Sequence, residues 1–160
     1  MKSVREALSR RQNGEAGFTL VELLIVMVII GLLAAIAVPF YLNQRKRSWI
    51  AAAESDLSSA VQAIVAVRAE HGTSTISFGN SGTAAVTKCG PASSGTSCNV
   101  YYDSTDSGQK INTSDRVSIE ITGGNSDDFT LTAKHEGITD QNKDTIVYTN
   151  KDGKTKNNMS

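Results

Sequence analysis

The chain has 160 residues, a length that accommodates one compact domain together with one membrane-crossing segment. Its 16 basic and 16 acidic side chains give a formal net charge of zero. The basic residues form no long stripe and few aromatic residues are interleaved with them, so nucleic-acid binding is not indicated. Two cysteines are too few for a structural zinc site, and we expect neither a metal nor a cofactor.

The first 44 residues divide into a basic leader and an apolar run. The leader, residues 1–17, carries four basic side chains: Lys2, Arg5, Arg10 and Arg11. From Phe18 to Gln44 the only charged side chain is that of Glu22. About 20 apolar residues are enough to cross a bilayer, and a helix that is apolar on all sides would otherwise need a larger protein around it. We therefore predict a transmembrane helix over residues 18–44.

A second helical pattern follows the basic triplet at residues 45–47. Apolar residues recur there at intervals of three or four, which is helical periodicity: Ile50, Ala53, Leu57, Ala60 or Val61, Ile64 and Val67. Gly72 is a typical stop signal. The pattern predicts one helix that runs from membrane into water, with an amphipathic part over residues 46–71. Pro39 would kink it, because proline removes a backbone donor and clashes with the preceding turn.

Three further features of this helix suggest roles. Gly31 is a second candidate for a kink, although close helix packing and simple tolerance are alternative interpretations. Tyr41 and Trp49 flank Arg45, Lys46 and Arg47, an arrangement that suits an interfacial anchor, with rings near headgroups and cations on phosphates. Contact between subunits is the other interpretation of these five residues.

The remainder of the chain predicts a small head. Residues 72–116 are rich in Gly, Ser, Thr, Asn and Asp and indicate a long loop, which short strands could interrupt. Cys89 and Cys98 lie in it, and a disulfide between them, favoured over two free thiols, would indicate an oxidising compartment. Alternation with period two then predicts an antiparallel meander over residues 117–149. We expect turns at Gly123-Gly124-Asn125 and residues 136–144, and a frayed tail over residues 151–160.

The stretch Gly17-Phe18-Thr19-Leu20-Val21-Glu22 follows the basic leader and opens the apolar run. In this setting it resembles the type III signal of prepilins, and the resemblance to the type IV pilin family covers about the first 55 residues, including Gly31, Pro39 and Tyr41. It implies an α+β fold, with one long helix packed on a small antiparallel sheet. It also implies that a membrane-embedded prepilin peptidase cleaves between Gly17 and Phe18 and methylates the new amine of Phe18.

The resemblance further implies a homo-oligomeric helical filament. The precursor would wait in the cytoplasmic membrane with its head outside, and an inner-membrane assembly platform would build it into an extracellular pilus for adhesion, motility or DNA uptake. Glu22 has a physical reason to take part, since a carboxylate in hydrocarbon costs at least about 2–3 kcal/mol without a partner. The new amine would lie one helical turn away, so the two charges could pair within one subunit or between neighbours. Alternatively, Glu22 snorkels to the interface.

Several rival interpretations remain open. The chain could be a minor pilin, a competence pilin or a secretion pseudopilin rather than a major pilin, and its cysteines lie earlier than the disulfide of many Gram-negative pilins. Ala35-Ile36-Ala37 has the form of a signal-peptidase site, whose use would release a soluble head. No hydrolase motif is present, so we expect no enzyme, with His71 and His135 on the surface. Residues 140–144 indicate a hairpin turn more than a calcium loop.

Overall fold

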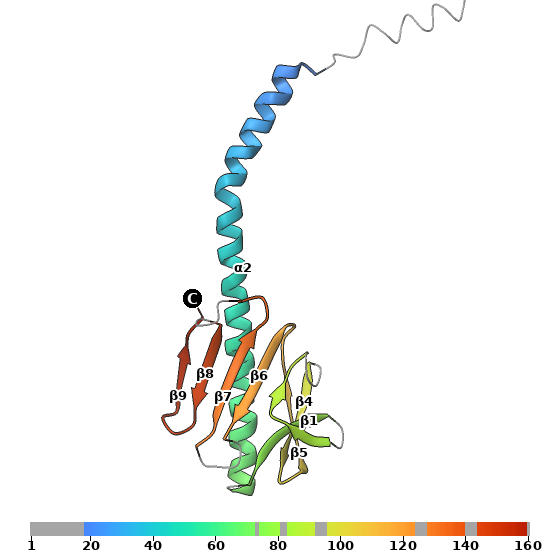
Figure 1. Ribbon diagram of the computed structural model, residues 1–160, viewed down its shortest axis with the longest axis vertical. Coiled ribbons are helices and arrows are strands. Elements are labelled where there is room, and N and C mark those ends of the chain that lie inside the picture. Colours follow the sequence, from blue (N-terminus) through green and yellow to red (C-terminus); the bar gives the residue numbers. More distant parts are fainter. Residues whose placement is uncertain are drawn as a thin grey trace, which may run out of the picture. The chain divides into compact units, whose positions relative to one another are not determined.

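The computed structural model describes residues 18–72, 74–80, 83–91, 96–123, 128–139 and 144–159. The leader, including Gly17, lies outside them, and so do residues 124–127 and 140–143 of the predicted turns. Internal contacts divide the chain into two units, Met1–Leu42 and Asn43–Ser160. Helix α2, Leu20–His71, supplies residues to both, and its helical hydrogen bonding continues past Pro39 (Figure 1).

The second half of α2 buries one face. Its buried residues follow the predicted spacing of three and four: Ala53, Asp56, Leu57, Ala60, Ala63, Ile64 and Val67. Gly72 ends the helix in a left-handed conformation with φ of 66°, and its N–H donates to the carbonyl oxygen of Arg68 at 2.9 Å. A glycine suits this position because it has no Cβ to strain.

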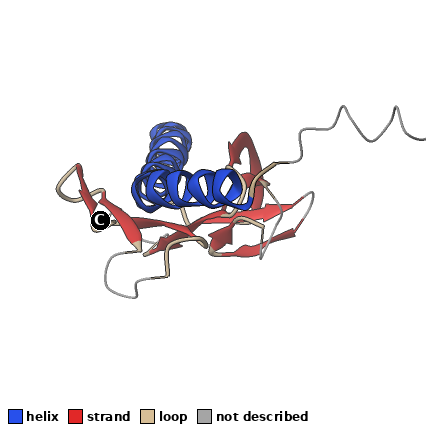
Figure 2. Cartoon of the chain, turned by 90° about the horizontal axis from the view of Figure 1, so that it is seen from above, coloured by secondary structure: helices blue, strands red, loops and turns tan. Residues whose placement is uncertain are grey.

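Within the described residues, nine strands form two antiparallel sheets. The first has the order β2-β1-β4-β5 and comprises β1 (Ile76–Asn80), β2 (Thr83–Val86), β4 (Ser97–Tyr102) and β5 (Thr105–Asn112). The second has the order β3-β6-β7-β8-β9 and comprises β3 (Lys88–Cys89), β6 (Val117–Thr122), β7 (Thr130–His135), β8 (Thr145–Thr149) and β9 (Lys154–Asn157). In Figure 1 the second half of α2 lies behind β6 to β9, and in Figure 2 the strands gather on one side of the helix.

The predicted α+β class and the meander are confirmed, because β6, β7 and β8 pair in sequence order within residues 117–149. Alternate residues of these strands, among them Ile119, Leu131 and Ile146, are buried against the helix residues Leu57 and Ile64 in one core. This burial of one face of the sheet and one stripe of the helix is what holds the head together.

Two predictions for irregular segments need correction. Residues 72–116 contain β1 to β5, so the strands that we expected only as short interruptions of a long loop make up much of this segment, because strands with few apolar residues are stabilised by pairing across long sequence separations. The tail is ordered over residues 154–159: β9 pairs with β8, and Met159 is buried in the core. Its attachment is reinforced by Asn157, whose side-chain amide donates to Glu54 on the helix at 2.6 Å.

Candidate assembly segment

The first part of α2 exposes almost all of its apolar surface. Every large apolar side chain from Phe18 to Leu42 is between 51% and 89% exposed. An 18-residue window of this helix has a mean hydropathy of 3.0 and no residue buried within the chain, so its length and composition allow it to cross a membrane. Each such side chain costs about 1.5–3 kcal/mol in water relative to burial. The segment therefore requires a lipid or protein environment that the subunit alone does not supply.

Thr19 and Glu22 form a capping box at the start of the helix. The backbone N–H and the hydroxyl of Thr19 donate to Glu22 Oε2 at 2.8 and 2.9 Å, and the N–H of Glu22 donates to Thr19 Oγ1 at 3.2 Å. These bonds satisfy donors that a helix start otherwise leaves open. The carboxylate predicted to serve assembly thus already has a partner within its own subunit. The spacing Thr-x-x-Glu indicates this motif in the sequence, although we did not predict it.

The two predicted kink positions differ in what surrounds them. A Cβ built on Gly31 meets nothing within 4 Å. Space beside Gly31 is therefore open to a neighbouring helix, and the three interpretations of this residue stay predictions. Pro39 lies inside α2, whose helical assignment runs on both sides of it. A kink there also stays a prediction.

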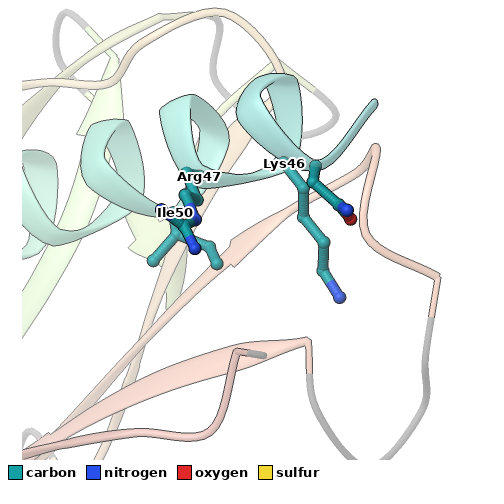
Figure 3. A pocket seen from close by; sticks show the side chains of 4 residues that line it. Lys46, Arg47 and Ile50 are labelled. Carbon is teal, nitrogen blue, oxygen red and sulfur yellow. The ribbon is translucent and has the colours of Figure 1, made fainter. Parts of the chain in front are cut away.

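The basic triplet lies at the start of the second unit. Arg47 and Lys46, with Asn43 and Ile50, line an open hollow of about 460 Å³ beside the helix (Figure 3). Figure 3 shows Arg47 and Ile50 close together, with the long side chain of Lys46 extending away from the helix. Such a hollow could receive a phosphate or a carboxylate, but the role of this triplet as an interfacial anchor is still a prediction. Tyr41, its predicted partner, is 63% exposed.

Trp49, the other aromatic residue of the predicted anchor, has contacts inside the head. Its ring stacks on His135 with centroids 4.8 Å apart, and the guanidinium carbon of Arg45 lies 4.8 Å from the same centroid. The expectation that both histidines lie on the surface is wrong for His135, which is 2% exposed. His71 is half-buried and stacks on Tyr102. Neither stack could be predicted from the sequence, because each joins residues far apart in the chain.

The predicted disulfide between Cys89 and Cys98 is present, and both residues are fully buried. Cys89 belongs to β3 of the five-stranded sheet and Cys98 to β4 of the four-stranded sheet, so the bond joins the two sheets. Gly90 follows at a close approach: an added Cβ would lie 2.7 Å from the Cα of Ser118. No metal cluster of three or more His, Cys, Asp or Glu occurs within the described residues.

Known proteins are similar to parts of this chain. Residues 12–38 match the family model described as the prokaryotic N-terminal methylation motif. A fimbrial protein of Pseudomonas aeruginosa is 49% identical over 47 residues, which cover 29% of this chain and 30% of that protein. The type IV major fimbrial protein FimA of Dichelobacter nodosus is 52% identical over 42 residues, or 26% of this chain and 27% of that protein.

The type IV major alpha-pilin of Moraxella bovis is similar over a longer range, with 32% identity over 111 residues, 69% of this chain and 62% of that protein. The matches to the other two relatives thus span less than a third of their length. No solved structure gives a significant match. The methylation motif, these relatives and a long apolar helix that continues into a helix-on-sheet head together support the type IV pilin family for this chain.

Proposed function

We propose that this chain is a structural, non-catalytic major pilin that assembles through residues 18–44 into an extracellular filament serving adhesion, motility or DNA uptake. The observation that carries the proposal is the methylation motif, residues 12–38, which includes the start of a helix whose apolar side chains are exposed on all sides. Removing such a helix from lipid is favourable only if other copies cover it. Relatives named as major pilins favour the major role over that of a minor pilin or pseudopilin.

Before assembly, the cytoplasmic membrane would hold the subunit with its head outside. Residues 18–44 span about 40 Å as a helix, enough for the hydrocarbon core of a bilayer. Tyr41 and the basic triplet Arg45-Lys46-Arg47 would then lie near headgroups. An inner-membrane assembly platform would draw the subunit from this reservoir into the fibre.

Processing between Gly17 and Phe18 by the prepilin peptidase is the first step that can be tested. We expect the mature chain to begin at Phe18 with a methylated amine, as measured by mass spectrometry of the N-terminal peptide. A mature chain that begins at Val38 would show cleavage after Ala37 by signal peptidase, and would replace the filament proposal with a secreted soluble domain.

Glu22 offers a sharper test, because its two candidate roles respond differently to substitution. Glutamine at this position keeps the capping box with Thr19 but removes the charge that would pair with the amine of Phe18. We expect Glu22→Gln and Glu22→Ala subunits to be processed yet poorly incorporated into fibres, measured by the ratio of sheared to cell-bound subunit. Efficient incorporation of Glu22→Gln with loss of Glu22→Ala would leave only the capping role. Full incorporation of both variants would refute any role in assembly.

The major role is separable from the alternatives by deletion. We expect cells lacking the chain to lose their surface fibres entirely when these are imaged, and fibres from wild-type cells to consist mostly of this subunit. Fibres that persist without it would assign the chain to the minor pilins. The absence of fibres from wild-type cells, combined with loss of protein secretion on deletion, would assign it to the pseudopilins.

A further inference from the structure

His135 is a buried titratable residue that the filament function does not use. It ends β7, and its imidazole packs against the indole of Trp49 on α2, with an interplanar angle of 17°. Both residues belong to the unit Asn43–Ser160. The stack therefore joins the C-terminal end of the central strand of the five-stranded sheet to the helix.

One hydrogen bond fixes the protonation state of this imidazole. The backbone N–H of Gly137 donates to His135 Nδ1 at 2.9 Å, so Nδ1 carries no proton and the ring is neutral. Gly137 in turn lies tightly on the stack, because an added Cβ would be 2.8 Å from Trp49 Cζ3 and 3.0 Å from His135 Cε1. Ile138 follows, is 3% exposed, and donates its N–H to the carbonyl oxygen of His135.

Burial and one nearby positive charge oppose protonation of the ring. Burial lowers the pKa of His135 below its ordinary value, and the positive charge of Arg116 lowers this pKa further, while Asp115 and Glu136 raise it by smaller amounts. Arg116 and Glu136 lie 3.9 Å apart and are both half-exposed, so they offset each other only in part. On the helix side the charged group is Arg45, over the same Trp49 ring.

We infer that His135, Trp49 and Gly137 form an acid-sensitive latch, which holds Gly137 and Ile138 beside Trp49 of the helix and opens when His135 takes up a proton. The proton comes from solvent and binds Nδ1. A protonated ring has two N–H donors and no acceptor, so the Gly137 N–H loses its partner. The bond that closes the latch cannot coexist with the imidazolium. Opening would expose Trp49 and Ile138 while the paired strands of the sheet remain intact.

The direction of the pH dependence follows from the lowered pKa. A histidine in an unfolded or opened segment titrates at about pH 6.5. Because the closed form binds its proton only at a lower pH, the closed form is fully favoured above about pH 6.5. It loses stability relative to the open form as the pH falls from there toward the lowered pKa.

Trp49 is the only tryptophan of the chain, so its fluorescence reports this site directly. The full-length mature chain in lipid nanodiscs would be titrated from about pH 7.5 to about pH 4.5, the range in which histidines change charge. We expect a one-proton transition in Trp49 emission with a midpoint below about pH 6.5. His135→Phe keeps an aromatic ring in the stack and should abolish the transition, whereas His71→Phe, which alters the other histidine, should retain it.

Charge variants separate a titrating latch from a merely structural ring. Arg116→Gln should raise the midpoint, because it removes a positive charge that lowers the pKa of His135, and Glu136→Gln should lower it. A transition that persists in His135→Phe, or a wild-type emission that does not change over this range, would overturn the latch.

Amide hydrogen exchange of the wild-type chain provides a test that needs no variant to fold. After correction for intrinsic rates, the protection of the Gly137 amide should fall about tenfold per pH unit as the pH decreases from about 6.5 toward the midpoint, as one coupled proton requires, and should be largely lost below the midpoint. The amide of Ile119, in the middle of β6, should keep its protection. Equal loss at both amides would indicate global unfolding, and constant protection at Gly137 would show that the bond survives protonation. Either result would contradict the latch.

Discussion

The two halves of α2 differ in where their apolar side chains lie. Both contain apolar residues at every turn, but the second half buries them on one face against its own sheets, whereas the first half leaves them exposed. Ile64 is fully buried and Ile29 is 51% exposed within one continuous helix. The head therefore buries its apolar side chains within its own unit. Those of the apolar half can be buried only by lipid or, in the proposed filament, by other copies.

The largest expected difference comes from shortening one isoleucine in each half. Ile64→Ala should lower the free energy of unfolding of the head by about 2–5 kcal/mol, because it leaves a cavity in a close-packed core. Ile29→Ala, its matched control, should leave head stability unchanged. Chemical denaturation in detergent, followed by the near-ultraviolet signal of the head, would measure both. An equal effect of the two substitutions would break the distinction between the halves.

The disulfide provides the next largest effect, and it is confined to the head. Replacing Cys89 and Cys98 together by alanine should lower the free energy of unfolding by about 3 kcal/mol, because the bond closes a loop between residues nine positions apart. Membrane insertion of the apolar half should not change, as judged by resistance to alkaline extraction. If the double variant left the membrane, the two halves would not be independent.

A pair of glycine substitutions sharpens the comparison further. Gly90→Ala should destabilise the head by about 1–3 kcal/mol, since the new methyl group would meet the backbone of β6 and the residue has φ of 146°. Gly31→Ala has open space around it and should leave the head unaffected. Thermal unfolding would compare them. Loss of fibres in Gly31→Ala with a stable head would indicate that copies pack at Gly31.

The smallest expected effect is at the helix start. Thr19→Ala removes the hydroxyl of the capping box and should destabilise the first turn by about 1 kcal/mol. Hydrogen exchange of the amides of residues 20–24 would measure the fraying, with the melting of the head as the control. Fraying that also weakened the head would contradict the separation of the two units.

The sequence predicted the parts of this structure that depend on local pattern. The apolar run, the helical spacing from Ala53 to Val67 and the alternation in β6, β7 and β8 each repeat over several residues. A repeated pattern identifies a helix or strand without knowledge of its partner. The capping box is equally local, so it too could have been predicted from the sequence.

The missed features depend on contacts between distant residues. Phe78 in β1 is buried opposite Val100 in β4, but Ser77 and Gly79 on either side of Phe78 are small, so Phe78 does not produce a strong strand signal. Asp56 lies on the buried face of α2, where the N–H and hydroxyl of Ser114 satisfy its carboxylate. The stack of His135 on Trp49 is likewise set by tertiary packing, which overrides local propensity.

The most direct test of the account is the accessibility of the apolar half in assembled fibres. Leu33 is 62% exposed in the subunit, and a Leu33→Cys variant would be treated with a water-soluble maleimide, in parallel with Asp152→Cys in the exposed turn before β9. If the apolar helices form the fibre core, intact sheared fibres should protect the thiol at position 33, and dissociation in detergent should expose it. The thiol at position 152 should react in both states. Equal reaction of the two thiols in intact fibres would show that the apolar helix does not form the fibre core.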